Sequence, residues 1–171
     1  MSEWKTAPLG DLVKIQKGKL SAHANFSKEG YLPVINTETI AGITSVWAEP
    51  IGSVLCDEND LLLLWDGERS GLVAYGFKGV VGSTFSKLTV SSDVEANYLY
   101  RQLQNKFRWI QQQRTGTGVP HVPKNLNIIL NIEYPTSLAE QRKIASILST
   151  VDEVIEKTEA AIAKYKAIKA G

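Results

Sequence analysis

A heptad repeat of apolar residues runs through the C-terminal part of the chain, from residue 144 to residue 168. Its a positions hold Ile144, Val151, Thr158 and Tyr165, and its d positions hold Ile147, Val154, Ala161 and Ile168. This stripe is widened at position e by Leu148, Ile155 and Ile162. A stripe kept for roughly four heptads predicts a helix that packs against a second long helix by knobs-into-holes contacts. A terminal helix that folds back onto its own domain is the alternative.

The residues before the repeat indicate where this helix begins. Pro135 ends the preceding segment, and Ser137 forms a capping box with Glu140 three residues later. A helix over 137–171 is about 50 Å long, at about 1.5 Å per residue. It is therefore longer than one turn of B-DNA, which measures roughly 34 Å, and has the length of a spacer.

Length and composition limit the number of domains. The chain has 171 residues, of which 43% are hydrophobic. This is enough for one core but not for two full domains with a linker. We expect a globular domain at 1–136 and a dimerisation and spacer helix at 137–171.

The cysteine and histidine counts exclude several kinds of site. Cys56 is the single cysteine, and only His23 and His121 accompany it, so we expect neither an intrachain disulfide nor a zinc site. The N-terminal residues lack a basic start followed by an apolar run, and no stretch reaches the roughly 20 apolar residues of a membrane span. We therefore expect a metal-free cytoplasmic protein that does not contact a membrane.

The first half of the chain alternates short β-rich runs with glycine-containing turns, which is typical of a mostly antiparallel sheet. The predicted strands are 11–16, 31–35, 43–47, 60–65, 72–77 and 85–90. Within the strand at 60–65, every residue from 61 to 65 is apolar, which predicts a central strand covered on both faces. Ser92 and Glu95 form a second capping box before an amphipathic helix at 97–113, which we expect to pack on the sheet. Glycines and prolines then make 114–125 a loop. The predicted class is α+β, with the long coiled-coil-forming helix at the C-terminus.

Charged residues are separated along the sequence although the net charge is only +1. Residues 96–132 contain no Asp or Glu but several Arg and Lys, whereas acidic residues gather at 49–68. This separation indicates either one positive face that meets a polyanion or an ordinary solvated surface.

Most catalytic motifs are missing from the sequence. The glycines near residue 116 are not followed by the lysine and hydroxyl of a phosphate-binding loop, and no GxGxxG turn follows a strand. Asp66, Glu68 and His121 are the candidates for acid–base chemistry, but turn carboxylates and a lone loop histidine are usually surface residues. We expect a chain without catalytic function.

DNA recognition requires hydrogen-bond donors on rigid loops. Side chains suited to base edges are Arg69, Arg114, His121 and Asn25. Lysines and glycine N–H groups suited to phosphates are Lys17, Lys19, Lys124, Gly116 and Gly118.

Four segments of the chain resemble the specificity subunits of type I restriction-modification systems, or one half of such a subunit. These segments read EWKTAPLGDLVKIQKGK, LLLLWDGERSGLVAYGFKG, TGTGVPHVPKNLNIILNIEYP and SLAEQRKIASILSTVDEVIEK. The last is the most specific, because it resembles the helix start of the family, with its L-x-E-Q-x-x-I-A-x-x-L pattern.

The resemblance implies two target-recognition domains joined by two antiparallel helices, of which this chain holds one domain and one helix. It further implies partners: double-stranded DNA, adenine methyltransferase (modification) subunits that use S-adenosylmethionine, and restriction subunits that use ATP and Mg. No cofactor is expected in this chain, which lacks the [DN]-P-P-[YFW] motif of adenine methyltransferases.

Either a natural half-subunit or a fragment fits the sequence. A homodimer through the helix supplies the missing half. The competing hypothesis is a helical protein-interaction adaptor that does not bind DNA.

Overall fold

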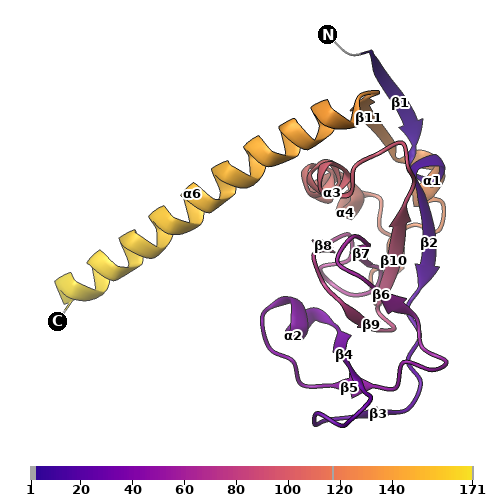
Figure 1. Ribbon diagram of the computed structural model, residues 1–171, viewed down its shortest axis with the longest axis vertical. Helices are drawn as coiled ribbons and strands as arrows, with labels where there is room; N and C mark the ends of the chain where they lie inside the picture. The colour runs from indigo at the N-terminus through magenta and orange to yellow at the C-terminus, as the bar shows by residue number, and fades with distance from the viewer. Residues whose placement is uncertain (1–2, 117, 171) are drawn as a thin grey trace.

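The computed structural model describes residues 3–116 and 118–170. One long helix, α6, projects from a body of short strands and helices (Figure 1). None of the helices in the described ranges combines the length and apolarity needed to cross a membrane.

A four-stranded antiparallel sheet forms the centre of the body. Its strands, in spatial order, are β2 (Val13–Lys17), β10 (Phe85–Val90), β7 (Leu61–Leu64) and β8 (Val73–Tyr75). All four leucines of β7 are buried, and alternate leucines enter two different hydrophobic clusters. Side chains alternate between the faces of a strand, so the predicted central strand covered on both faces is confirmed.

A second sheet of five short strands lies at the end of the body farthest from β1 (Figure 1). Its strands, in spatial order, are β3 (His23–Ala24), β5 (Trp47–Ala48), β4 (Leu32–Ile35), β9 (Gly79–Val81) and β6 (Leu55–Cys56). Only β4 and β9 pair in parallel. Helix α2 (Thr37–Ile40) follows β4 and is capped by Asn36, whose Oδ1 accepts the Thr39 N–H at 2.8 Å.

The strand predicted at 43–47 is wrong except for its last residue. The Ile43 N–H donates to the carbonyl of Glu38 at 2.9 Å, and the Ser45 hydroxyl donates to the Glu38 carboxylate. Because Ile43 and Ser45 bond back to α2, the chain joins the second sheet as a strand only at Trp47.

Strand β1 (Trp4–Pro8) pairs with β11 (Asn131–Pro135) and so brings both ends of the body together. Helices α1 (Leu9–Leu12) and α5 (Leu126–Ile129) pack against each other beside this pair. The strand predicted at 11–16 therefore begins two residues late, at Val13. Leu9 and Leu12 are both buried, and a spacing of three residues buries one side of a helical turn.

The single helix predicted at 97–113 is two helices, α3 (Ala96–Asn105) and α4 (Phe107–Gln112). The Lys106 N–H donates to the carbonyls of both Gln102 and Leu103. The bond to Leu103 spans three residues, so the helix tightens here and α3 ends. The predicted capping box of Ser92 with Glu95 is wrong. Glu95 is itself the N-cap, with extended backbone, and its Oε2 accepts the Tyr98 N–H at 2.7 Å.

Helix α6 (Leu138–Ala170) confirms the long C-terminal helix. Ser137 Oγ accepts the Glu140 N–H at 3.4 Å, as its predicted capping role requires. One turn later, the side chain of Gln141 is fully buried and joins three segments. Its Oε1 accepts the Glu95 N–H at 2.7 Å, and its Nε2 donates to the carbonyls of Pro135 at 2.8 Å and Asp93 at 3.1 Å. We call this junction the root of α6.

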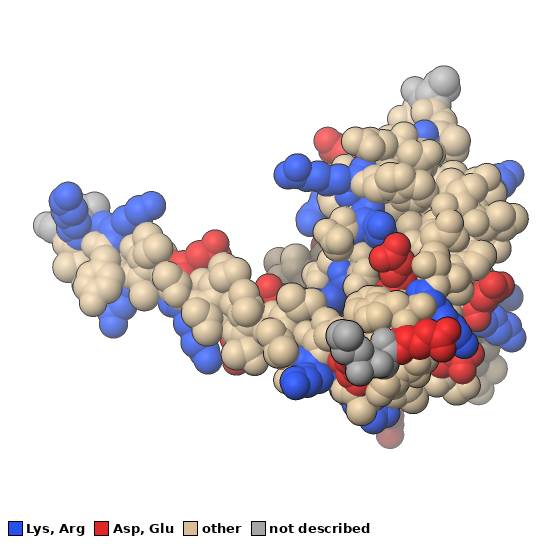
Figure 2. Space-filling model, turned by 90° about the horizontal axis from the view of Figure 1, so that it is seen from above, with Lys and Arg blue, Asp and Glu red and all other residues tan. Residues whose placement is uncertain are grey.

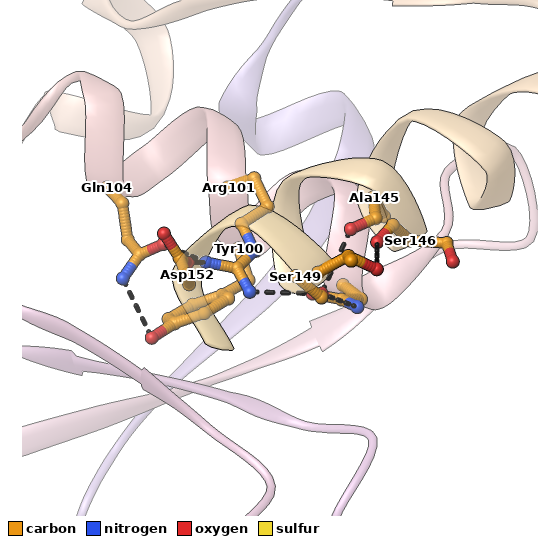
Figure 3. A network of polar contacts seen from close by, with 9 residues as sticks. Tyr100, Arg101, Gln104, Ala145, Ser146, Ser149 and Asp152 are labelled. Carbon is orange, nitrogen blue, oxygen red and sulfur yellow. Dashed lines mark hydrogen bonds and ion pairs between the residues drawn. The ribbon is translucent and has the colours of Figure 1, made fainter. Parts of the chain in front are cut away.

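A polar network holds the next turns of α6 against α3 (Figure 3). Arg101 donates to the Asp152 carboxylate and, at 3.0 Å, to the Ser149 hydroxyl. Its guanidinium lies 5.3 Å from the Tyr100 ring centroid, which adds a cation–π contact. Gln104 in turn donates to the Tyr100 hydroxyl at 2.8 Å.

Beyond Asp152, each residue of α6 up to residue 169 is exposed. The eight large apolar residues of the stripe after Ile144 are between 42% and 74% exposed. Ile144 alone is partly buried against the core of the body. The back-folded alternative therefore describes only the first turns of α6, and the rest of the stripe is uncovered.

Candidate nucleic-acid interface

Two loops that are distant in sequence form one surface at the end of β7. The Gly67 N–H donates to Pro120 O, and the Val122 N–H donates to Trp65 O, each at 2.9 Å. A β-bridge also pairs Asp66 with His121. We call residues 65–72, 114–116 and 118–125 the joined loops.

Gly116 gives the second of these loops its shape. Its φ is +104°, and a Cβ at this position would lie 2.7 Å from the Val119 carbonyl oxygen. A side chain is therefore excluded by both conformation and space. Beyond it, Gly118 is exposed and has open space around it.

Arg114 fastens the joined loops to the end of α4. Its Nη1 donates to the Glu68 carbonyl at 2.6 Å, and its Nε donates to the Gln111 carbonyl at 2.9 Å. The Gln111 side chain reaches the same Glu68 carbonyl at 3.3 Å. Two of the five N–H donors of Arg114 thus hold protein backbone, so its predicted contact with a base is left with the remaining N–H groups.

Lys17, Asp66 and His121 form a charged cluster on the joined loops and the adjacent end of β2. Lys17 Nζ lies 2.6 Å from Asp66 Oδ2, and His121 Nδ1 lies 2.7 Å from Asp66 Oδ1. Lys17 Nζ also lies 6.0 Å from the Trp65 ring centroid. About half of the Lys17 and His121 side chains remains exposed, against 27% for Asp66.

The ionisation of Asp66 follows from these contacts. Partial burial acts to raise the pKa of Asp66, but hydrogen bonds from Lys17 and His121, together with their charges, outweigh it. The pKa of Asp66 therefore lies below its ordinary value of 3.8, and the group is a carboxylate at neutral pH.

Two hollows flank the joined loops. Lys124 and Trp65 line one of about 280 Å³, together with Ile15 of β2. Arg69 lines the other, of about 410 Å³, beside Tyr75 and Tyr100. Both cationic side chains are exposed.

The remaining predicted DNA contacts lie away from the joined loops. Lys19 is an exposed residue just beyond β2, where its carbonyl accepts the Val54 N–H at 2.9 Å. Asn25 is exposed next to β3, in the second sheet. Of the predicted set, the fold therefore gathers Lys17, Arg69, Arg114, Gly116, Gly118, His121 and Lys124.

The separation of charges along the sequence is not kept in space. Asp66 comes from the acidic segment and pairs with Lys17 and with His121 of the acid-free segment. Arg101, of that same acid-free segment, pairs with Asp152 on α6. The candidate interface is thus a mixed surface with exposed cations around one central carboxylate.

Sequence reasoning missed the importance of Asp66 and Gln141. Asp66 looked like a solvated turn residue because its partners are 49 and 55 residues away. Gln141 lies within the helix-start pattern quoted above, so the sequence marked the residue. It did not indicate which three segments the side chain would join.

The acid–base candidates are divided by the fold. Asp66 and His121 are in contact, whereas Glu68 contributes only its carbonyl to the contacts of these loops. In the described part of the chain, the hydrogen bond of the His121 ring leads to Asp66 and not to a hydroxyl or thiol. Burial raises the pKa of the Cys56 thiol to about 11, so this cysteine is a poor nucleophile at neutral pH.

Known proteins resemble this chain over most of its length. The family model described as "Type I restriction modification DNA specificity domain" matches residues 1–165. The MjaVIII type I restriction enzyme specificity subunit of Methanocaldococcus jannaschii is 37% identical over 157 residues, which cover 90% of this chain and 37% of that protein. The EcoDI specificity subunit of Escherichia coli is 27% identical over 163 residues, covering 92% of this chain and 33% of that protein.

A solved structure has a similar fold. The HsdS subunit from Thermoanaerobacter tengcongensis superposes with a TM-score of 0.71 at 18% identity, covering 92% of this chain and 39% of that one. At this identity the likeness concerns the fold alone. The chain thus spans little more than a third of the length of the proteins it matches.

Proposed function

Because the chain belongs to the family of type I restriction-modification DNA specificity domains, we propose that it reads one half of a bipartite target in double-stranded DNA. In this proposal it is a non-catalytic specificity module of the cytoplasm. Adenine methyltransferase subunits dock on it, and restriction subunits join them. S-adenosylmethionine, ATP and Mg are needed only by those partner subunits.

The joined loops are the observation that carries the recognition role. They mount Arg69, His121 and Lys124 on backbone that is itself hydrogen bonded across the two loops. Arginine and histidine reach base edges in the major groove, while lysine suits phosphates. Hydrogen-bonding groups on a rigid support lose little conformational entropy on binding, which is the requirement for reading sequence.

Pairing through α6 supplies the second half of the target. The exposed stripe has no cover on this chain beyond the first turns, and its burial against a second copy is favourable at about 1.5–3 kcal/mol for each fully buried Ile, Leu or Val. A symmetric homodimer buries the same face of both copies. Two recognition domains are then held at a fixed separation.

Charges on α6 favour an antiparallel pair. Acidic residues outnumber basic ones midway along the helix, and basic residues gather near its tip (Figure 2): Asp152, Glu153, Glu156 and Glu159 surround Lys157, and Lys164, Lys166 and Lys169 follow. The four acids lie at positions b, c and f, away from the seam, so they act between paired helices only at longer range. A parallel pair would keep each acidic stretch beside the other acidic stretch, whereas an antiparallel pair brings acidic and basic stretches together. An antiparallel pair that crosses near Ala160 instead places Val151 opposite Ile168, and Val154 opposite Tyr165, of the second copy.

Selection from a randomised duplex library tests the recognition role. Arg69→Ala should relax one position of the selected sequence, at a cost of about 1–3 kcal/mol for a bidentate contact. Lys124→Ala should weaken all sequences alike and lower the salt slope by about one unit. Lys5→Ala is the matched control, because Lys5 is an exposed lysine on β1, away from the joined loops. Binding that is insensitive to salt and sequence would refute the proposal.

Sedimentation separates the homodimer from the adaptor alternative. A concentration-dependent dimer of the full chain supports the proposal. A chain that stays monomeric and pairs only with a foreign helix supports an adaptor. A methyltransferase subunit that purifies with the chain supports the proposed partnership.

A further inference from the structure

The backbone of His121 is held on both sides, and its ring is oriented by Asp66. The backbone N–H of His121 donates to the Thr115 carbonyl at 2.9 Å, and the His121 carbonyl accepts the Thr115 N–H at 3.1 Å. Pro120 precedes it, and the Pro120 carbonyl accepts the Gly67 N–H at 2.9 Å. The ring is nevertheless 46% exposed, so it is held in place and open to a ligand.

Asp66 decides which ring nitrogen of His121 carries the hydrogen. A carboxylate only accepts hydrogen bonds, so the nitrogen 2.7 Å from Asp66 Oδ1, Nδ1, must be the donor. In a neutral imidazole the other nitrogen, Nε2, is then an acceptor. Lys17 holds the second oxygen of the same carboxylate at 2.6 Å, which fixes the direction of Asp66.

With Nε2 as an acceptor, His121 can bind only a base that offers a hydrogen-bond donor. In the major groove, only adenine N6 and cytosine N4 carry hydrogen-bond donors, whereas guanine and thymine present acceptors at the corresponding edge. We propose that His121 is a specificity-determining residue whose Nε2 accepts from the exocyclic amino group of one adenine or cytosine, and that Asp66 is its positioning residue. This inference rests on the proposed DNA recognition and names the contacted group.

Replacing Asp66 by asparagine tests the assignment with nearly the same shape. The amide of Asp66→Asn can donate to Nδ1, so the hydrogen of the neutral ring moves to Nε2 and the acceptor becomes a donor. Selection by the full chain should then change at one position, from adenine or cytosine toward guanine or thymine, by about tenfold. Loss of one negative charge also raises the affinity for all sequences, but that change is uniform.

Two further variants and one spectroscopic readout make the test specific. His121→Ala should lose the preference at that one position and keep the others. Nitrogen NMR of the imidazoles reports the tautomer without DNA, and His23→Gln assigns the signals, because the chain has two histidines. We expect hydrogen on Nδ1 in the wild type and on Nε2 in Asp66→Asn.

The outcomes separate this inference from the proposed function. If the wild type selects a sequence and Asp66→Asn selects the same one with only a uniform change in affinity, the role of His121 is refuted and DNA recognition stands. Hydrogen on Nε2 in the wild type also refutes it. If the wild type binds all sequences equally, the proposed function fails and the assignment fails with it.

Discussion

Replacing Val154 by alanine tests the pairing of α6 with little effect on the body of the protein. Val154 lies at a d position and is 58% exposed in the single chain. The substitution removes two methyl groups, worth about 0.8 kcal/mol each when buried. Pairing can bury only the 58% of the side chain that is exposed in the single chain, so the two methyl groups contribute about 0.9 kcal/mol of pairing free energy per copy. A symmetric dimer contains the layer twice, so the loss is about 1.9 kcal/mol, or roughly a 20-fold higher dissociation constant.

Sedimentation equilibrium over a range of concentrations measures this change. Glu156→Ala is the matched control, because Glu156 is exposed at position f, on the opposite side of the helix from the stripe. Its charge acts on a partner helix only at long range, so this variant should change the dissociation constant by much less than Val154→Ala does. Alanine favours helix at both positions, so the helix itself is not weakened. A dimer that is unchanged by Val154→Ala, or equally affected by Glu156→Ala, would refute pairing through the stripe.

Three other predictions concern the body and the polar network that holds α6 against α3. Tyr98→Phe should lower the free energy of unfolding by about 1–2 kcal/mol in denaturant titrations, because the buried hydroxyl donates to the Glu133 carbonyl at 2.8 Å. Arg101→Ala should reduce the protection of the first half of α6 in hydrogen exchange, since it removes the contacts with Ser149 and Asp152; unchanged protection would show that the network does not hold the helix. The pKa of Asp66 is lowered in the folded chain, so its ionised form stabilises the fold above pH about 4, and this contribution is lost as the pH falls through the lowered pKa. The stability difference between wild type and Asp66→Asn should therefore shrink on acidification, and a difference that is constant with pH would contradict the ion pairs.

The sequence predicted those parts of the fold that depend on local pattern. The run at 61–65 is apolar throughout, and its strand is buried on both faces. The heptad repeat gave the long helix and its uncovered stripe. Where a pattern was short, tertiary contacts decided instead. Ile43 and Ser45 bond to α2, Val46 bonds to β4, and Lys106 divides an amphipathic stretch that reads as one helix.

The candidate interface was only partly predictable for a related reason. Loop composition marked Arg114, Gly116 and His121, because glycine and proline exclude regular structure there. Nothing local indicated that Arg114 would hold the Glu68 carbonyl, or that Asp66 would lie between Lys17 and the His121 ring. Such pairings depend on how distant segments meet, which neither periodicity nor composition records.

The buried glutamine at the root of α6 has a consequence for measurement of length along DNA. Gln141 ties the start of the helix to β11 and to the first turn of α3, so it acts at the fulcrum of a lever of about 50 Å. A tilt of about 4° at that fulcrum displaces the far tip by about 3.5 Å, close to the rise of one base pair of roughly 3.4 Å. In the proposed dimer, Gln141 and the Arg101 network together set the angular tolerance within which two half-sites stay in register.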